Sequence, residues 1–221
     1  MSELKKLFVN TRKNEDLSKF SWFNLGGPAE LFFRPNAIEE LSSFLINNNK
    51  KIHVLGAGSN TLIRDGGIKG VTLKLGSNFS YTKVINEKFI EVGSATLDKN
   101  LSNFATNNSI SGFEFLSCIP GSVGGAIKMN SGCYGEDISK ILISVKIMDK
   151  QGKIKIFNGE EINFRYRGCD LLDEFIILSA VFKGKKSTKE LVEKKQTNLI
   201  NKKKHSQPSQ IKTCGSTFKN P

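Results

Sequence analysis

Long apolar runs are absent from this sequence of 221 residues. No stretch approaches the roughly 20 apolar residues that a membrane-spanning helix needs. The first residues, MSELKKLFVNTRKNEDLSKF, lack the uninterrupted apolar segment of a secretory signal peptide. We therefore expect a cytoplasmic protein without a membrane partner.

Paired cysteines are absent as well. The four cysteines are widely spread and form no C-x-x-C motif, which zinc sites and redox dithiols commonly use. We therefore expect no metal site, and reduced thiols at Cys118, Cys133, Cys169 and Cys214.

Acidic residues are fewer than basic ones, and the formal net charge is +12. Nine Lys and two Glu between Lys183 and Lys204 account for +7 of this charge. The segment predicts a surface helix, with a capping box from Ser187 to Glu190 and sparse apolar positions. Because no aromatic residue lies in this lysine-rich run, bases would find no stacking platform, and we expect no nucleic-acid partner. The charge favours an anionic small molecule instead.

Strand and helix patterns alternate along the chain, which indicates a mixed α and β fold. Leu31 to Leu55 reads as one β-α-β unit, whose helix Asn36 caps with Glu39. Further strands are predicted at 70–75, 88–94 and 175–182, and around a turn at 150–152, with a helix within 96–109. No internal repeat is visible.

The stretch VLGAGSN, at 54–60, follows an apolar strand and is a candidate phosphate cradle. It is not a Rossmann fingerprint, because the third Gly is missing and TLIRDGG follows in place of an amphipathic helix. It is not a P-loop, because the motif's Lys is missing. Backbone N–H groups, helped by Ser59 and Asn60, could hold a pyrophosphate. A tight turn with positive φ at two glycines is the alternative.

A second glycine-rich region, GFEFLSCIPGSVGGAIKMNSGCYG, spans Gly112 to Gly135. Too many glycines lie here for a simple turn. Two such regions in one mixed fold indicate an extended ligand laid across the backbone.

Four motifs together closely resemble the UDP-N-acetylenolpyruvoylglucosamine reductase family: GAGSN, the region 112–135, FRYR and QPSQIKTCGSTFKNP. The resemblance runs from FNLGGPAE to the last residue, and GAGSN is shared with the wider group of vanillyl-alcohol-oxidase-like FAD proteins. It implies an α+β fold: a two-lobed FAD-binding domain at 1–184, with lobes about 1–70 and 71–184. The start of an α+β substrate-binding domain would follow at 185–221.

The resemblance also implies that the phosphate is the pyrophosphate of FAD, held by one loop from each lobe. The implied cofactor-binding residues are Gly56, Ala57, Gly58, Ser59, Asn60, Ile119, Pro120, Gly121, Ser122, Gly124 and Gly125. A covalent flavin at His53 is not suggested, since this residue alternates outward on its strand.

The activity implied is reduction by NADPH, through FAD, of the enolpyruvyl group of a UDP-sugar, giving UDP-N-acetylmuramate for peptidoglycan. Arg167 resembles the family's Arg that binds the enolpyruvyl carboxylate, and Ser216 the Ser that delivers a proton to the substrate. Tyr166 matches a substrate-binding position. Lys203 or Lys204 would meet the nucleotide phosphates. Without the resemblance, Arg167 is more typical of a surface strand, Ser216 of a Gly-Ser turn and Tyr166 of a half-buried strand position. We expect a monomer.

Two departures from the family pattern leave alternatives open. Cys169 stands where the family usually has Ser, which puts a local hydrogen bond in doubt. The family continues after FKNP for most of another lobe, including a catalytic Glu, whereas this sequence ends at Pro221. A truncated module that binds FAD or UDP-sugar without turnover is therefore the alternative function. A different FAD oxidoreductase is disfavoured, because QPSQIKTCGSTFKNP supplies the substrate-lobe motif.

Overall fold

The computed structural model describes residues 10–170 and 174–207, which form two compact units, 10–76 and 77–207. The sequence placed the first lobe boundary near residue 70. It also assigned 185 onward to a further domain. Both domain assignments stay predictions, although helix α5 belongs to the second compact unit.

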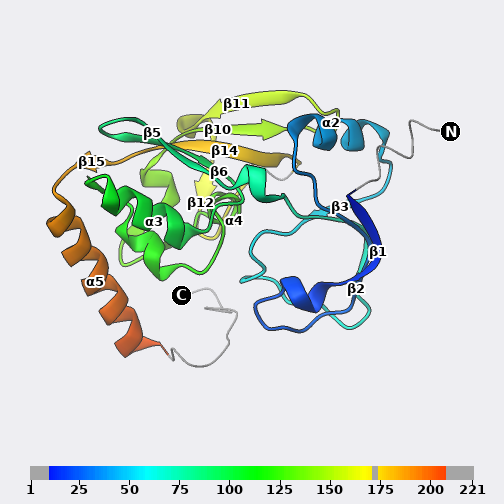
Figure 1. Cartoon of the computed structure of the whole chain (residues 1–221), viewed down its shortest axis with the longest axis horizontal. Helices are drawn as coiled ribbons and strands as arrows, with labels where there is room; N and C mark the ends of the chain where they lie inside the picture. The colour runs from blue at the N-terminus through cyan, green and yellow to red at the C-terminus, as the bar shows by residue number, and fades with distance from the viewer. Residues whose placement is uncertain (1–9, 171–173, 208–221) are drawn as a thin grey trace. The chain divides into compact units, whose positions relative to one another are not determined.

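The first unit is built on a mixed four-stranded sheet with strand order β1-β2-β4-β3 (Figure 1). The outer β1 pairs antiparallel with β2, while β4 pairs parallel with both β2 and β3. The strands are β1 (Thr11–Asp16), β2 (Pro28–Phe33), β3 (Ile52–Val54) and β4 (Ile68–Leu73), and the short helix η1 is Leu17–Phe20. The predicted β-α-β unit is thus confirmed as β2-α2-β3.

Helix α2 (Ile38–Asn47) packs its apolar face on this sheet, where the Phe33 and Phe44 rings stack with centroids 3.9 Å apart. The expected cap at Asn36 with Glu39 is wrong. The N-cap is Ala37, and Glu40 is the residue that reaches back to accept a hydrogen bond from the Asn36 backbone N–H, at 2.8 Å. Glu40, one position later, therefore takes the role assigned to Glu39.

The second unit contains a five-stranded antiparallel sheet with strand order β11-β10-β14-β6-β5. Helices α3 and α4 lie on one face of it (Figure 1). The elements are β5 (Thr82–Asn86), β6 (Phe89–Gly93), α3 (Asp98–Asn107), α4 (Val123–Lys128), β10 (Leu142–Met148), β11 (Ile154–Asn158) and β14 (Ile176–Lys183). The predicted strands at 88–94 and 175–182 and the helix within 96–109 are confirmed.

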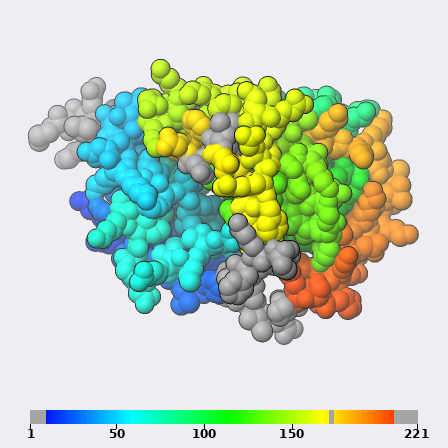
Figure 2. Space-filling model, turned by 180° about the vertical axis from the view of Figure 1, so that it is seen from behind, coloured from blue at the N-terminus to red at the C-terminus, as the bar shows by residue number. Residues whose placement is uncertain are grey.

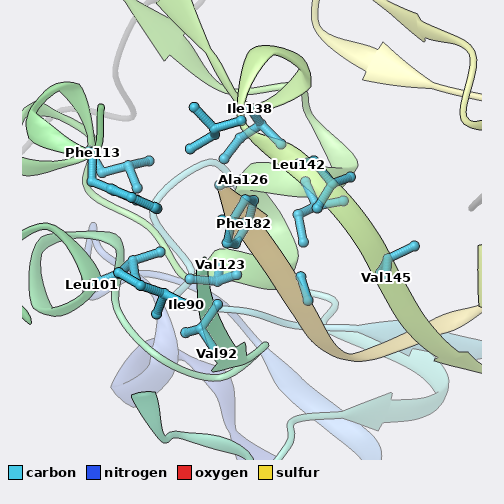
Figure 3. Packing of buried hydrophobic residues seen from close by; sticks show 14 of the residues in the cluster. Ile90, Val92, Leu101, Phe113, Val123, Ala126, Ile138, Leu142, Val145 and Phe182 are labelled. Atoms are coloured by element: carbon cyan, nitrogen blue, oxygen red, sulfur yellow. The ribbon is translucent and has the colours of Figure 1, made fainter. Parts of the chain in front are cut away.

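The core of the second unit forms where these helices meet the sheet. Apolar side chains from α3, α4, β6 and β14, such as Leu101, Val123, Ile90 and Phe182, fill one continuous cluster (Figure 3). Phe113 contributes an edge-on contact to Phe182, with ring centroids 6.3 Å apart. This packing fixes α4, and with it the loop that precedes α4.

Short elements complete the second unit. The two-residue strand pairs are β7 (Ile110–Ser111) with β15 (Lys185–Lys186), β8 (Gly132–Cys133) with β9 (Glu136–Asp137), and β12 (Phe164–Arg165) with β13 (Gly168–Cys169). The 3₁₀ helices are η2 (Ser77–Phe79), η3 (Glu114–Cys118), η4 (Ile138–Lys140) and η5 (Gly159–Glu161).

The lysine-rich helix α5 (Lys189–Ser206) lies along the outside of the second unit beside α3 (Figure 1). It buries only Val192 and Gln196, as expected of a surface helix. Its cap is Thr188, whose hydroxyl accepts from the Leu191 N–H at 3.4 Å, so the predicted start at Ser187 is one residue early. Within 10–170 and 174–207, no helix is long and apolar enough to cross a membrane.

Candidate functional site

The loop after β3 is fixed at both ends by backbone hydrogen bonds. The Leu55 N–H donates to the Leu73 carbonyl at 2.8 Å, and the Gly58 carbonyl accepts from the Trp22 N–H at 3.0 Å. Gly58 has φ of 72°, and a β-carbon there would lie 2.0 Å from the carbonyl oxygen of Phe20. Close packing against η1 therefore explains Gly58 without any ligand. The turn interpretation expected positive φ at two glycines of this loop, and Gly58 has it whereas Gly56 does not.

The loop residues are exposed or half-buried, except for Gly58, which is buried. Among the described residues, no acceptor pairs with the backbone N–H of any residue from 56 to 60, nor do the Ser59 and Asn60 side chains have a described partner. Successive unpaired N–H groups in a turn can bind an anion. The loop thus has the donor set that a pyrophosphate needs.

Lys74 adds a positive charge to this loop, which the sequence analysis missed. It follows β4, and its ammonium group donates to the Gly56 carbonyl and lies 5.9 Å from the centre of the Phe20 ring. Burial lowers the pKa of Lys74, and neighbouring Arg34 lowers it further. The group is a fixed cation held against the loop backbone.

The second predicted loop is tied to the segment between β6 and α3. The Val123 N–H donates to the Thr96 carbonyl and the Gly124 N–H to the Ser94 carbonyl, each at 2.9 Å. The Asp98 N–H in turn donates to the Gly121 carbonyl at 3.1 Å. These three bonds hold residues 121–124 in place. Because the Gly124 N–H bonds to the Ser94 carbonyl, it is not free to bind a ligand.

The glycines of the second loop differ in what surrounds them. A β-carbon on Gly121 would lie 2.5 Å from Oδ2 of Asp98, and one on Gly124 would lie 3.1 Å from Cβ of Ser94. On the exposed Gly125 it would meet only Oγ of Ser122, at 3.6 Å. Protein packing therefore accounts for Gly121 and Gly124. Gly125 is open on the surface, where a ligand can approach.

Tyr166 and Arg167 form the two-residue turn of the β12–β13 hairpin. The segment around this hairpin, yellow in Figure 2, lies on the face shown there. Arg167 adopts a left-handed φ of 59°, and its guanidinium lies 5.6 Å from the centre of the Tyr166 ring. Arg165 on β12 is paired with Asp170 at 2.7 Å. Left-handed backbone at a non-glycine residue is uncommon and is found more often at functional sites.

Cys169, on β13 of this hairpin, is buried, and it stands where the sequence analysis expected Ser. Its Sγ lies 3.5 Å from the carbonyl oxygen of Lys128, at the end of α4. A thiol is a weak donor, so this contact is a weak hydrogen bond. Cys118 and Cys133 form no disulfide among the described residues, and burial raises the pKa of Cys133 to about 12.

Lys203 lies in the last turn of α5, and its ammonium group donates to the Cys118 carbonyl at 2.5 Å. It thereby contacts the residue before Ile119, where the second loop begins. Neighbouring Lys204 is exposed. The described residues do not include Ser216, the predicted proton donor, or Cys214.

Comparison with known proteins defines the class first. Residues 29–158 match the family described as "FAD binding domain". The chain is therefore a member of a FAD-binding protein family, and both predicted glycine-rich loops lie inside the matched region.

The individual relatives are more specific. The chain is 48% identical over 208 residues to UDP-N-acetylenolpyruvoylglucosamine reductase of Pelagibacter ubique, covering 93% of this chain and 69% of the relative. It is 44% identical over 212 residues to the enzyme of the same name from Rickettsia bellii, covering 95% and 70%. The crystal structure of that reductase from Thermus caldophilus superposes with a TM-score of 0.83 at 29% identity, covering 96% of this chain and 74% of that one.

These matches identify the chain as a member of the UDP-N-acetylenolpyruvoylglucosamine reductase family. The expected α+β fold is confirmed. The residues also fit FAD, because the first loop has unpaired N–H groups beside the Lys74 cation and Gly125 is open to a ligand.

Proposed function

We propose that this chain is an FAD-dependent reductase that uses NADPH to reduce the enolpyruvyl group of UDP-N-acetylglucosamine enolpyruvate. The product is UDP-N-acetylmuramate, for peptidoglycan synthesis. The observation that carries this proposal is the row of unpaired N–H groups at 56–60, within a chain that belongs to this reductase family.

Two loops would contribute to holding FAD. In the first, the unpaired N–H groups of Gly56, Ala57, Gly58, Ser59 and Asn60 would bind the pyrophosphate, with Lys74 supplying positive charge. In the second, the contacts would come from residues around the exposed Gly125: Ile119, Pro120, Gly121, Ser122, Gly124 and Gly125. When bound, FAD supplies hydride transfer from NADPH to the substrate.

Arg167 would bind the enolpyruvyl carboxylate. A fixed guanidinium would stabilise the negative charge that develops next to that carboxylate during reduction. The hairpin turn holds the Arg167 backbone in one conformation, and the ring of Tyr166 supports the guanidinium from one side. Tyr166 is 55% exposed, so its ring is also accessible to a substrate.

Ser216 would deliver the proton that completes the reduction, at the carbon next to the one that receives hydride. Lys203 would contact the nucleotide phosphates, with Lys204 as the alternative. Since one hydrogen of the Lys203 ammonium is committed to Cys118, the remaining two could bind a phosphate oxygen.

The proposal includes a monomer in the cytoplasm, with small molecules as its partners. The packing of α5 supports only the choice of small-molecule partners, because its lysines belong to a helix that buries Val192 and Gln196 against the unit and do not form a free basic arm. Size-exclusion chromatography with light scattering would test the monomer.

The decisive experiment follows the flavin spectrum without oxygen. The purified protein should show the visible bands of an oxidised flavin, and denaturation should release FAD. NADPH should bleach these bands, and the enolpyruvyl UDP-sugar should then restore them. Absence of flavin would refute the cofactor assignment. Bleaching without recovery would instead support the binding-module alternative.

A further inference from the structure

The side chain of Asp98 is a buried carboxyl group, and the proposed reaction assigns no role to it. Asp98 is the first residue of α3 and is 0% exposed. Neither of its carboxyl oxygens has a hydrogen-bond partner among the described residues. A buried polar group without a partner is costly, so its presence requires an explanation.

The position of Asp98 links it to the second loop. Oδ2 occupies the space beside the α-carbon of Gly121, 2.5 Å from where a β-carbon would be. The backbone of Asp98 also bonds to this loop, since its N–H donates to the Gly121 carbonyl at 3.1 Å. Asp98 is thus buried and packs directly against Gly121, in the middle of the Pro120–Ser122 segment.

Burial alone raises the pKa of Asp98, from 3.8 to about 8. The titratable groups on η3, α4, α5 and the adjoining segments make other contacts or are exposed. Glu114 of η3 accepts from Ser111 and Gly112, Tyr81 donates to Glu91, Lys203 of α5 donates to Cys118, Lys128 ends α4 with contacts of its own, and Lys99 is exposed. None of them contributes to the shift, so the carboxyl group is neutral at pH 7.

We propose that Asp98 is a positioning residue for the second loop: its neutral carboxyl group keeps Pro120–Ser122 in the conformation that binds FAD, and its ionisation releases the cofactor. This inference rests on the proposed role of the second loop in binding FAD. It assigns no contact between Asp98 and FAD, because the carboxyl group is fully buried.

The physical link is hydration. Burying a carboxylate without water or a partner is costly, and movement of the adjacent loop away from Asp98 would let water reach it. Such movement breaks the bond between the Asp98 N–H and the Gly121 carbonyl and displaces the residues up to Gly125. The fraction of protein with a closed loop therefore falls as pH rises above the pKa of Asp98. Apparent FAD affinity falls with it, by about tenfold between pH 7 and pH 9.

The test is an FAD titration of flavin-free protein, followed by quenching of flavin fluorescence, from about pH 6 to about pH 9. Asp98→Asn keeps the shape of the side chain and cannot ionise. Glu160→Gln, at an exposed position of η5, is the matched control for loss of a carboxylate. We expect the parent and Glu160→Gln to lose about tenfold in affinity by pH 9, and Asp98→Asn to keep its affinity throughout. An equal loss in Asp98→Asn would overturn the inference.

The outcomes separate the two proposals. A parent that binds FAD equally well at all pH values would overturn only the role of Asp98. A parent that binds none at any pH would overturn the cofactor assignment as well. If Asp98→Asn does not fold, infrared spectroscopy of the parent gives the answer through the carbonyl band of a protonated carboxylic acid. This band should disappear with the same midpoint as FAD release, and a midpoint one pH unit away would overturn the link.

Discussion

The ammonium group of Lys203 donates a hydrogen bond to the carbonyl oxygen of Cys118 at 2.5 Å. This contact joins the last turn of α5 to the end of η3, one residue before the second loop begins. Lys202 reinforces the same end of the helix, with its ammonium 4.7 Å from the centre of the Tyr134 ring. The C-terminal turn of α5 is thus attached to the part of the unit that leads into the predicted cofactor loop.

Lys203→Ala should therefore lower the free energy of unfolding by about 1 kcal/mol, because a carbonyl loses a charged hydrogen-bond donor. Lys204→Ala is the matched control, since the exposed neighbour has no described hydrogen bond or ion pair. Urea denaturation of both variants measures the difference. Equal stability of the two would show that the contact with Cys118 is not formed in solution.

Gly125→Ala should separate folding from cofactor binding. The position is exposed and inside α4, and an added methyl group meets nothing closer than 3.6 Å. Alanine is the better helix former, so the flavin-free protein should gain about 0.5 to 1 kcal/mol of stability. FAD affinity should fall nonetheless, because the methyl group occupies space assigned to the cofactor. Thermal denaturation and FAD titration of the same sample measure both effects.

Gly58→Val tests the first loop, with a different expectation. Its side chain would collide with the Phe20 carbonyl and force a β-branched residue into positive φ. It should lose both stability and FAD. Gly66→Ala is the matched control, since nothing described lies within 4 Å of the added atom. Normal FAD binding by a folded Gly58→Val protein would exclude this loop from the site.

Arg167→Gly should stabilise the fold but slow turnover. Glycine relieves the left-handed backbone at this turn, a gain of up to about 1 kcal/mol. Loss of the fixed cation should slow the reduction of substrate by roughly 10²- to 10³-fold. Arg165→Ala, on the same hairpin, removes only an exposed ion pair with Asp170 and should leave turnover unchanged. Unchanged turnover in Arg167→Gly would exclude the proposed role.

Ser216→Ala should affect only the second half of the reaction. Flavin reduction by NADPH needs no proton on the sugar substrate, so its rate should match that of the parent. Recovery of the oxidised flavin spectrum after addition of substrate should slow by about 10²- to 10⁴-fold, the usual cost of losing a positioned proton donor. Stopped-flow absorbance measures both steps. Recovery at the parental rate would assign the proton to another group.

The sequence predicted the regular elements well, because hydrophobic periodicity survives in a single sequence. The strand at 52–54, the helix at 98–107 and the buried strand at 176–183 lie where the pattern placed them. Both helix caps lie one residue later than predicted, at Ala37 and at Thr188. Helix ends are set by backbone geometry, which the sequence pattern does not fix to within one residue.

The site was only partly predictable from the sequence. Glycine-rich motifs identified both loops, but a motif cannot tell a glycine needed for packing, as at Gly58, from one exposed to a ligand, as at Gly125. Lys74 and Asp98 were missed because a lysine after a strand and an acid at a helix start are ordinary surface residues. Their significance comes from burial, which depends on segments distant in the sequence.

Asp98 should also give the free energy of unfolding a distinctive pH dependence. Its pKa is raised by burial from 3.8 to about 8 in the folded protein. Below about pH 4 both the folded and the unfolded chain bind the proton, and the neutral group is fully compatible with folding. Between about pH 4 and pH 8 only the folded chain binds it, so stability falls as pH rises, by at most about 1.4 kcal/mol per unit. Above about pH 8 the slope vanishes.

Asp98→Asn removes this slope, whereas Glu160→Gln retains it, because the exposed Glu160 does not share the buried environment of Asp98. Urea denaturation of the flavin-free proteins across this pH range yields the difference between parent and Asp98→Asn, in which contributions from all other groups cancel. The free energy of unfolding of the parent minus that of Asp98→Asn should be largest at acid pH and should fall steadily towards pH 8. A difference that is independent of pH would mean that Asp98 ionises equally in both states and that water reaches it in the folded protein.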